Sequence, residues 1–215
     1  MPRESKIVRS RRAQHIADGL RLLYPAKCAL THENPFQLLI ATILSAQCTD
    51  ERVNQVTPVL FAKYPAPQTF VDAKQRDIEK IIHSTGFFRA KAKNILSAGR
   101  AIVRDHHGEV PRTMAELVVL PGIGRKTANV VLGTAFGLAE GVVVDTHVGR
   151  LARRMGLTRQ TDAVKVENDL MALMPQTEWI EFSHRLIWHG RRICMARKPL
   201  CDSCSLRKDC FRVGL

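Results

Sequence analysis

Two residues near the centre of the chain, Lys126 and Asp145, could take part in catalysis. Lys126 follows a turn-forming run, LPGIGR at 120–125, and Asp145 follows the β-branched run at 142–144. A lysine amine becomes a nucleophile once it loses its proton, which a desolvated site and a neighbouring cation such as Arg125 both favour. Each residue also has a simpler interpretation, because most helical lysines are solvated and an aspartate before a helix usually caps it.

Four of the six cysteines form a second group of residues that could take part in chemistry. Cys194, Cys201, Cys204 and Cys210 are spaced C-x6-C-x2-C-x5-C. Disulfide frameworks belong to short secreted chains with a targeting signal, and this chain fits neither condition, so the pattern favours metal ligation. Four thiolates can hold zinc or an iron–sulfur cluster, although zinc sites usually use two short cysteine pairs.

The residues around Lys126 predict a helical hairpin. The Pro-Gly-Ile-Gly run at 121–124 favours a tight turn, since proline fixes one φ angle and glycine accepts positive φ values. From Arg125 onwards apolar residues repeat with the period of one helix face, and we expect this helix to end near Gly137. Asp145 is expected to cap the next helix. On a different face of the first helix we expect room for a ligand beside Lys126, Asn129, Val130 and Gly133.

The remaining sequence also predicts helices. Asn34 and Pro35 are typical of a helix cap and a first helical residue, and Thr49 or Asp50 can cap the helix that follows. No period-2 alternation is long enough to build a sheet, so the predicted fold class is all-α. Helical spacing of apolar residues occurs within 1–25, 36–46, 50–60, 78–86, 91–103, 113–120, 146–155, 164–173 and 182–192.

The composition indicates a polyanionic partner. Thirty-three Lys and Arg against twenty Asp and Glu give a net charge of +13, which favours nucleic acid first and an anionic membrane surface second. Apolar runs fall short of the roughly 20 residues that span a bilayer, and charges occupy 1–12 where a signal peptide needs an apolar stretch. We therefore expect a soluble intracellular protein. Aromatic residues make up only 6%, which argues against binding built mainly on stacking.

The hairpin run and the Val-Asp-Thr-His run at 144–147 together closely resemble the helix-hairpin-helix and GPD signature of the endonuclease III family of DNA glycosylases. The resemblance extends from about Pro35 to Cys210. It implies that Lys126 is the amine nucleophile and Asp145 its carboxylate partner. The cysteine spacing is similar to the [4Fe–4S] loop of that family at each of its four positions, and iron rather than zinc rests on this similarity.

The resemblance also implies the domain organisation and the setting. It implies two helical lobes with a cleft between them, a six-helix bundle at 29–139 and a discontinuous iron–sulfur domain at 1–28 plus 140–215, with Lys126 and Asp145 on opposite walls. The implied partner is double-stranded DNA with damaged bases or abasic sites, bound by a monomer in the cytoplasm of a bacterium or archaeon, at the nucleoid. A monovalent cation on the hairpin carbonyls is also implied.

The implied reaction is excision of oxidised pyrimidines. The damaged base is flipped into the cleft, Lys126 attacks C1′, and the Schiff base allows β-elimination. Asp145 stabilises positive charge as the glycosidic bond breaks. Two alternatives are a monofunctional mismatch glycosylase, which forms no Schiff base, and a non-catalytic DNA-binding protein whose cluster senses redox state.

Several residues are expected to contact DNA. Backbone N–H groups of Gly122, Gly124 and Arg125 can bind a phosphate at a helix N-terminus. By resemblance, Gln47 fills the gap left by the flipped base, with Ser45 close by. The family usually has leucine then tyrosine after the glycine of the opposite loop, whereas this sequence has Phe87 and Phe88 as an aromatic wedge. The other expected contacts are Lys91, His147, Arg192, Arg197 and Lys198.

Overall fold

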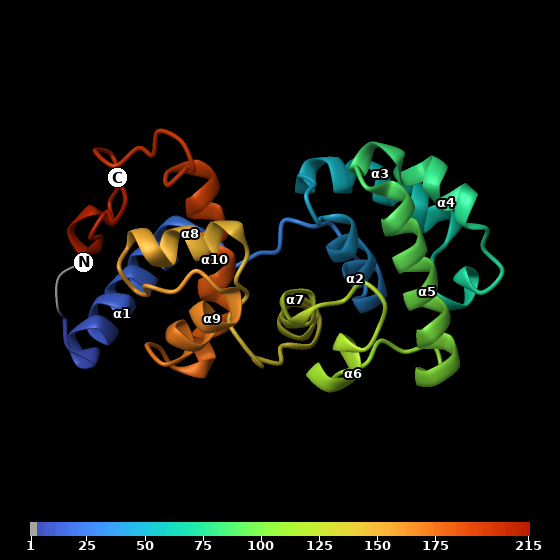
Figure 1. The fold of residues 1–215 in the computed structure, drawn as a ribbon, viewed down its shortest axis with the longest axis horizontal. Helices are drawn as coiled ribbons and strands as arrows, with labels where there is room; N and C mark the ends of the chain where they lie inside the picture. The colour runs from blue at the N-terminus through green and yellow to red at the C-terminus, as the bar shows by residue number, and fades with distance from the viewer. Residues whose placement is uncertain (1–3) are drawn as a thin grey trace. The chain divides into compact units, whose positions relative to one another are not determined.

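The protein was analysed as a computed structural model that describes residues 4–215, so the first three residues of the basic N-terminal tail lie outside the described residues. Within this range the chain consists of helices and loops and has no strand, which confirms the predicted all-α class (Figure 1). The helices are α1 (Lys6–Leu23), α2 (Pro35–Leu44), α3 (Asp50–Lys63), η1 (Pro67–Phe70), α4 (Gln75–Ile82), η2 (His83–Thr85), α5 (Phe88–His106), α6 (Met114–Val118), α7 (Arg125–Phe136), α8 (Thr146–Arg154), α9 (Ala163–Met171), η3 (Gln176–Glu178), α10 (Trp179–Arg192) and η4 (Arg207–Asp209).

The chain divides into two compact units. The middle unit is Cys28–Leu138, and the terminal unit combines the described residues up to Lys27 with Ala139–Leu215. Helices α2 to α7 belong to the middle unit, and α1 and α8 to α10 belong to the terminal unit. Lys126 therefore lies in the middle unit, whereas Asp145 and the four clustered cysteines lie in the terminal unit. The division into a six-helix bundle at 29–139 and an iron–sulfur domain at 1–28 plus 140–215 stays a prediction.

The middle unit is built around α2, which is buried on nearly every side. Asn34 caps this helix by accepting a hydrogen bond from Gln37 N at 3.0 Å, and Pro35 is the first helical residue, as the sequence predicts. Every residue from Phe36 to Leu44 is buried, so the apolar run makes α2 a core helix. Helix α7 packs against α2 within the same unit.

Helix α5 begins earlier than the sequence predicts. It starts at Phe88 rather than Lys91, because Gly86 and Phe87 have positive φ angles of 68° and 45° and form the break before the helix. We expected the preceding helix to end at Gly86. Helix α4 ends earlier, at Ile82, and one turn of 3-10 helix, η2, lies between α4 and Gly86. A positive φ is unusual for a residue with a side chain, so no local pattern signals it at Phe87.

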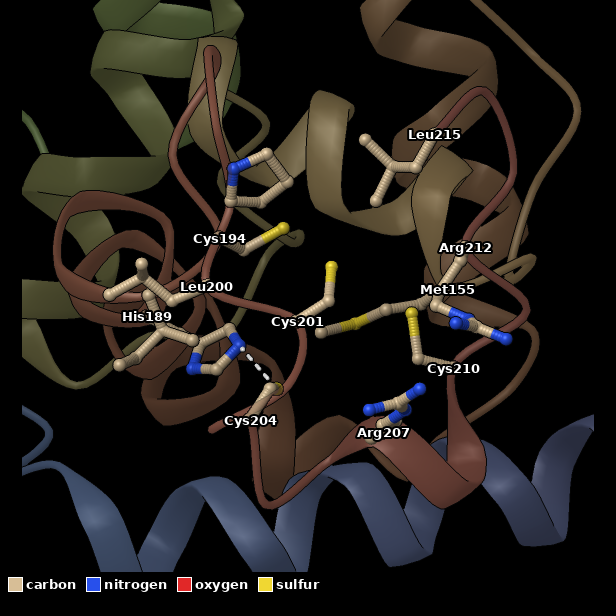
Figure 2. Close-up of a pocket in the computed structure, with 12 residues that line it drawn as sticks. Met155, His189, Cys194, Leu200, Cys201, Cys204, Arg207, Cys210, Arg212 and Leu215 are labelled. Atoms are coloured by element: carbon tan, nitrogen blue, oxygen red, sulfur yellow. Dashed lines mark hydrogen bonds between the residues drawn. The ribbon is translucent and has the colours of Figure 1, made fainter.

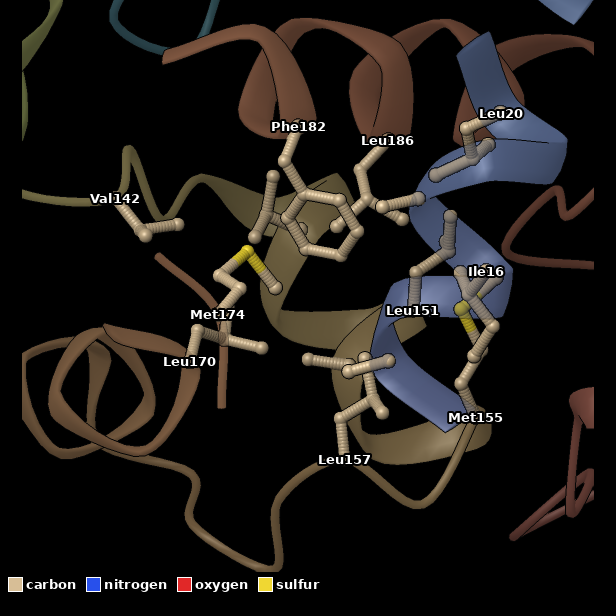
Figure 3. Packing of buried hydrophobic residues seen from close by; sticks show 14 of the residues in the cluster. Ile16, Leu20, Val142, Leu151, Met155, Leu157, Leu170, Met174, Phe182 and Leu186 are labelled. Carbon is tan, nitrogen blue, oxygen red and sulfur yellow. The ribbon is translucent and has the colours of Figure 1, made fainter. Parts of the chain in front are cut away.

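The terminal unit has an apolar core to which α1, α8, α9 and α10 all contribute (Figure 3). Ile16 and Leu20 of α1 are completely buried against residues far along the chain, and Phe182 and Leu186 of α10 cover the same core. Burying an aliphatic or aromatic side chain of this size stabilises the fold by about 1.5–3 kcal/mol each. Among residues 4–215, no helix combines the length and the apolar character that a membrane span requires.

Arg12 links α1 to the rest of the terminal unit. Its guanidinium donates to Met155 O at 2.6 Å, to Gly156 O at 3.1 Å and to Asp209 O at 2.9 Å, and it pairs with the Glu4 carboxylate at 2.8 Å. Both side chains of this ion pair are buried. The Arg12 guanidinium lowers the pKa of the Glu4 carboxyl, chiefly through the hydrogen bond between them.

We predict that Arg12→Met destabilises the protein by about 3–5 kcal/mol, because it removes the donor to three backbone carbonyls and the closer of the two ion pairs of Glu4. The measurement is the free energy of unfolding in urea. The control is Arg104→Met, which breaks an exposed ion pair with Asp105 and should leave that free energy unchanged. Equal effects of the two substitutions would contradict the importance of the buried pair.

Candidate active site

The turn before Lys126 has the geometry of a type II turn. Ile123 N donates to Leu120 O at 3.2 Å, Pro121 follows the first residue, and Gly122 has a φ of 79°. A Cβ atom added at Gly122 would lie 2.7 Å from the Cβ of Asn94 on α5. Glycine is therefore required at this position for two reasons, the positive φ angle and the close approach of α5.

Helix α7 begins at Gly124 without a side-chain cap. Gly124 is the N-cap and has no side chain that could accept a hydrogen bond, and a Cβ atom added to it would meet no other atom within 4 Å. The first backbone N–H groups of a helix lack partners within the helix and carry partial positive charge. The end of α7 at Gly124 and Arg125 thus has the properties of a phosphate-binding site.

Lys126 is the second residue of α7, and its side chain is exposed. The expectation of a wider ligand face is wrong, because Asn129, Val130 and Gly133 are all buried. Around Lys126, the accessible part of the helix is its first turn, because the residues from Thr127 to Gly133 are all buried. Since Lys126 is exposed, any desolvation of its amine must come from a bound substrate.

Asp145 caps α8, as the sequence predicts. One oxygen of its half-buried carboxylate, Oδ1, accepts a hydrogen bond from Val148 N at 2.8 Å. This bond fixes the orientation of the carboxylate. An ionised carboxylate can accept further hydrogen bonds, so capping is compatible with a catalytic role.

His147 lies in the first turn of α8 and is half-buried. Its Nδ1 is 3.2 Å from Nη2 of Arg150. Burial lowers the pKa of His147, Arg150 lowers it further, and the negative charge of Asp145 acts in the opposite direction. Contact between His147 and DNA stays a prediction.

The four clustered cysteines line one pocket of the terminal unit, together with His189 and Met155 (Figure 2). All six cysteines of the chain are free thiols. Burial raises the pKa of the Cys204 and Cys210 thiols. In the described part of the chain, no group of three or more His, Cys, Asp or Glu side chains is arranged to hold a single metal ion.

Two side chains that the sequence analysis did not single out face the cysteine sulfurs. His189 Nε2 lies 3.6 Å from Cys204 Sγ, and Arg154 Nη1 donates to Cys194 Sγ at 3.5 Å. Nδ1 of His189 is 3.1 Å from the hydroxyl of Tyr24, and burial lowers the pKa of this histidine to about 4. Nothing in the local sequence distinguishes His189 from an ordinary core position.

Arg150 and Arg154 also hold the backbone of the cysteine segment. Arg150 Nη2 donates to Gly190 O at 2.9 Å and to Cys194 O at 2.8 Å. Arg154 donates to Met195 O at 2.6 Å and to Ala196 O at 2.9 Å. Their spacing of four residues, which puts both on one face of α8, is the signal that sequence analysis could have used.

Three residues of the middle unit that carry side chains have a left-handed backbone conformation: His107, with a φ of 55°, at the end of α5, and Gln47 and Phe87 in two loops that follow helices. Gln47 has a φ of 52° and is exposed, and Phe87 has a φ of 45° with 67% of its surface exposed. Both residues lie in the left-handed region, which is disfavoured for residues other than glycine and is found preferentially at functional sites. Ser45, near Gln47, is half-buried and donates its hydroxyl to Thr42 O at 2.9 Å.

The other expected DNA contacts differ in accessibility. Arg192, Arg197 and Lys198 are exposed, and Lys198 has a φ of 50°. The expectation of a phosphate contact at Lys91 is wrong, because this residue is buried and its ammonium donates to Leu44 O at 2.8 Å and Thr85 O at 2.7 Å. An ammonium that already donates to two backbone carbonyls inside the protein is not available to DNA.

Comparison with known protein families first identifies the superfamily to which the chain belongs. Residues 40–176 match the family model described as HhH-GPD superfamily base excision DNA repair protein. The matched range includes the turn before α7, Lys126, Asp145 and both loops with left-handed residues.

Individual relatives with high sequence identity identify the family within this superfamily. Endonuclease III of Synechocystis sp. is 56% identical over 94% of this chain and 93% of its own length, and endonuclease III of Bacillus subtilis is 46% identical over 90% and 89%. A non-covalent endonuclease III–DNA complex aligns with a TM-score of 0.89 at 44% identity, covering 94% of each chain. This chain therefore belongs to the endonuclease III family of the HhH-GPD superfamily.

Another solved structure shares only the fold. A thermostable thymine-DNA glycosylase aligns with a TM-score of 0.83 at 23% identity, covering 93% of this chain and 95% of that one. Its agreement supports the helical architecture and carries no argument about substrate.

Proposed function

We propose that the protein is a bifunctional DNA glycosylase and abasic-site lyase that removes oxidised pyrimidines from double-stranded DNA in base excision repair. Among similar structures is a trapped covalent endonuclease III–DNA intermediate, with a TM-score of 0.89 at 44% identity. Such an intermediate requires a nucleophile on the protein. We assign that role to Lys126.

The observation that carries this proposal is the position of Lys126 beside an uncapped helix N-terminus. The first turn of α7 offers backbone N–H groups to a phosphate and an exposed lysine amine to the sugar attached to it. A phosphate held at Gly124 and Arg125 would bring the neighbouring deoxyribose to Lys126. Binding through the backbone reads no base sequence, which suits an enzyme that must act at damage in any sequence.

In the proposed reaction the neutral amine of Lys126 attacks C1′ of the extruded nucleotide. As the C1′–N bond forms, the bond between C1′ and the base breaks and the base leaves with a proton. The C1′–O4′ bond then breaks, O4′ takes a proton as the sugar ring opens, and an iminium forms between C1′ and the lysine nitrogen. Loss of a proton from C2′ then breaks the C3′–O bond, so the strand is nicked by β-elimination. The Asp145 carboxylate stabilises the positive charge that develops on the sugar.

Two features of the chain would favour the neutral amine when DNA is bound. Arg125 places a positive charge next to Lys126 in sequence, and the extruded nucleotide would exclude water from the exposed amine. We further propose that Lys126 and Asp145 act on the same bound nucleotide.

We also propose that Cys194, Cys201, Cys204 and Cys210 hold a [4Fe–4S] cluster. The donor set fits, because four thiols line one pocket and two N–H groups, from His189 and Arg154, lie near sulfurs that would carry negative charge. The cluster would fix the conformation of the loop that presents Arg197 and Lys198 to DNA phosphates. As a separate point, we propose that the enzyme acts on the nucleoid of a bacterial or archaeal cell.

We predict that borohydride traps a covalent adduct between the protein and DNA that contains an abasic site, because reduction of the iminium makes the bond permanent. Lys126→Ala should give no adduct. An adduct that survives in Lys126→Ala would exclude this lysine as the nucleophile. Base excision without any adduct in the native protein would favour a monofunctional glycosylase, and binding without excision or nicking would favour a non-catalytic DNA-binding protein.

We predict that Asp145→Asn lowers the rate of base excision at least about 100-fold, by removing a carboxylate that acts in the reaction. The free energy of unfolding should change by less than about 0.5 kcal/mol, because asparagine caps a helix as well as aspartate. Asp162→Asn is the matched control, since Asp162 caps α9 by accepting from Lys165 N at 3.0 Å. If Asp145→Asn leaves excision as fast as Asp162→Asn does, Asp145 is only a cap.

We predict that the purified protein contains about four iron atoms per chain together with acid-labile sulfide, as a [4Fe–4S] cluster requires. Metal analysis and visible absorption measure both. Cys201→Ser should lose the cluster, whereas Cys28→Ser, outside the C-terminal group, should keep it. One zinc per chain in place of iron would contradict the cluster assignment.

A further inference from the structure

Lys91 is a buried cation whose function the reaction above does not explain. It lies on α5 with 4% of its surface exposed, and its ammonium donates to Leu44 O at 2.8 Å and Thr85 O at 2.7 Å. Its backbone N–H donates to Phe87 O at 3.0 Å. Burial lowers the pKa of Lys91, and Cys48 acts in the opposite direction. Placing a lysine here has a desolvation cost, which the two charge-assisted hydrogen bonds offset.

The two carbonyls that bind the ammonium belong to the two loops with left-handed residues. Leu44 is the last residue of α2, and the turn that follows it contains Gln47 and closes with a hydrogen bond from Cys48 N to Ser45 O at 3.1 Å. Thr85 is the last residue of η2, and Gly86 and Phe87 follow it directly. Lys91 therefore contacts both loops at the point where each leaves a helix.

A left-handed conformation at a residue with a side chain costs free energy, and the surrounding structure must maintain it. Next to Phe87, the Lys91 ammonium gives this support by donating to Thr85 O, whereas the bond from Lys91 N to Phe87 O is an ordinary helical bond. At Gln47 the same ammonium fixes the end of α2. One side chain thus fixes the separation between two exposed residues that lie far apart in sequence.

We propose that Lys91 is a positioning residue that holds Gln47 and Phe87 as one rigid unit for insertion into the DNA duplex. This inference rests on the proposed function, because it takes both residues as the ones that enter the base stack. Two groups held at a fixed separation insert together without the entropy cost of ordering each loop separately. Lys91 does not touch the reacting sugar, so it acts on extrusion of the base and not on bond breaking.

The experiment compares Lys91→Met with Arg100→Met. Methionine has a similar length to lysine and no charge. Arg100 is a matched control on the same helix, because its guanidinium also donates to two backbone carbonyls, Val71 O at 3.1 Å and Ala73 O at 3.3 Å, which border neither loop. Two single-turnover rates are measured for each protein: excision of an oxidised pyrimidine from a duplex, and nicking at an abasic site in a single-stranded oligonucleotide.

For Lys91→Met we expect duplex excision to slow on the order of tenfold, the size expected when a buried charged hydrogen bond is lost. Nicking of the single strand should change by less than about twofold, because no base pair has to be opened there. Arg100→Met should change neither rate. Lys91→Met that excises from duplex as fast as Arg100→Met, or that slows both reactions equally, would overturn the proposal.

A second measurement remains decisive if Lys91→Met fails to fold. In the native background, Gln47→Ala, Phe87→Ala and the double variant are compared for duplex excision. A rigid unit predicts non-additive effects on the activation free energy, and additive effects would overturn the proposal. Failure of the proposed function has a different signature, because the native protein would then form no borohydride adduct with abasic DNA at all.

Discussion

The uncapped N-terminus of α7 is the feature on which the site depends. Helices α1, α2, α3, α6, α8 and α9 begin at Ser, Asn, Thr or Asp residues whose side chains accept a backbone hydrogen bond. At α7 a glycine occupies this position, and the type II turn at Leu120–Ile123 holds the helix end against α5. In the proposed function, backbone donors of this turn bind a phosphate beside Lys126.

Several positively charged side chains of the protein form hydrogen bonds within it. Arg12, Lys91, Arg150 and Arg154 each donate to two or more backbone carbonyls, often of segments far away in sequence. Such contacts satisfy carbonyls at helix ends and loops that have no other regular partner. A net charge of +13 therefore overstates the charge that DNA can meet, and accessible cations such as Arg197 and Lys198 are better candidates for phosphate contacts.

The loops at Gln47 and Phe87, which we propose to insert into DNA, each contain a strained backbone residue beside a carbonyl bound by Lys91. Gln47 and Phe87 have side chains in a backbone conformation that would be cheaper for glycine, which indicates that the side chain itself is needed there. Phe87 and Phe88 stand where the family usually has leucine and tyrosine. Only Phe87 is largely exposed, whereas the Phe88 ring packs against His83 with centroids 4.4 Å apart. An aromatic ring at the exposed position suits stacking between bases.

The sequence by itself determined the features that depend on neighbouring residues. Helical periodicity, the caps at Asn34, Thr49 and Asp145, and the turn at Gly122 all involve interactions within a few positions, and the structure contains each of them. The family, and with it the function, also followed from short motifs. Only the tertiary structure decided that Lys91 is buried, that Val130 closes the expected ligand face, and that Arg154 reaches the cysteine segment. The physical reason is that their partners are distant in sequence, so burial and hydrogen bonding are settled by how helices pack and not by local pattern.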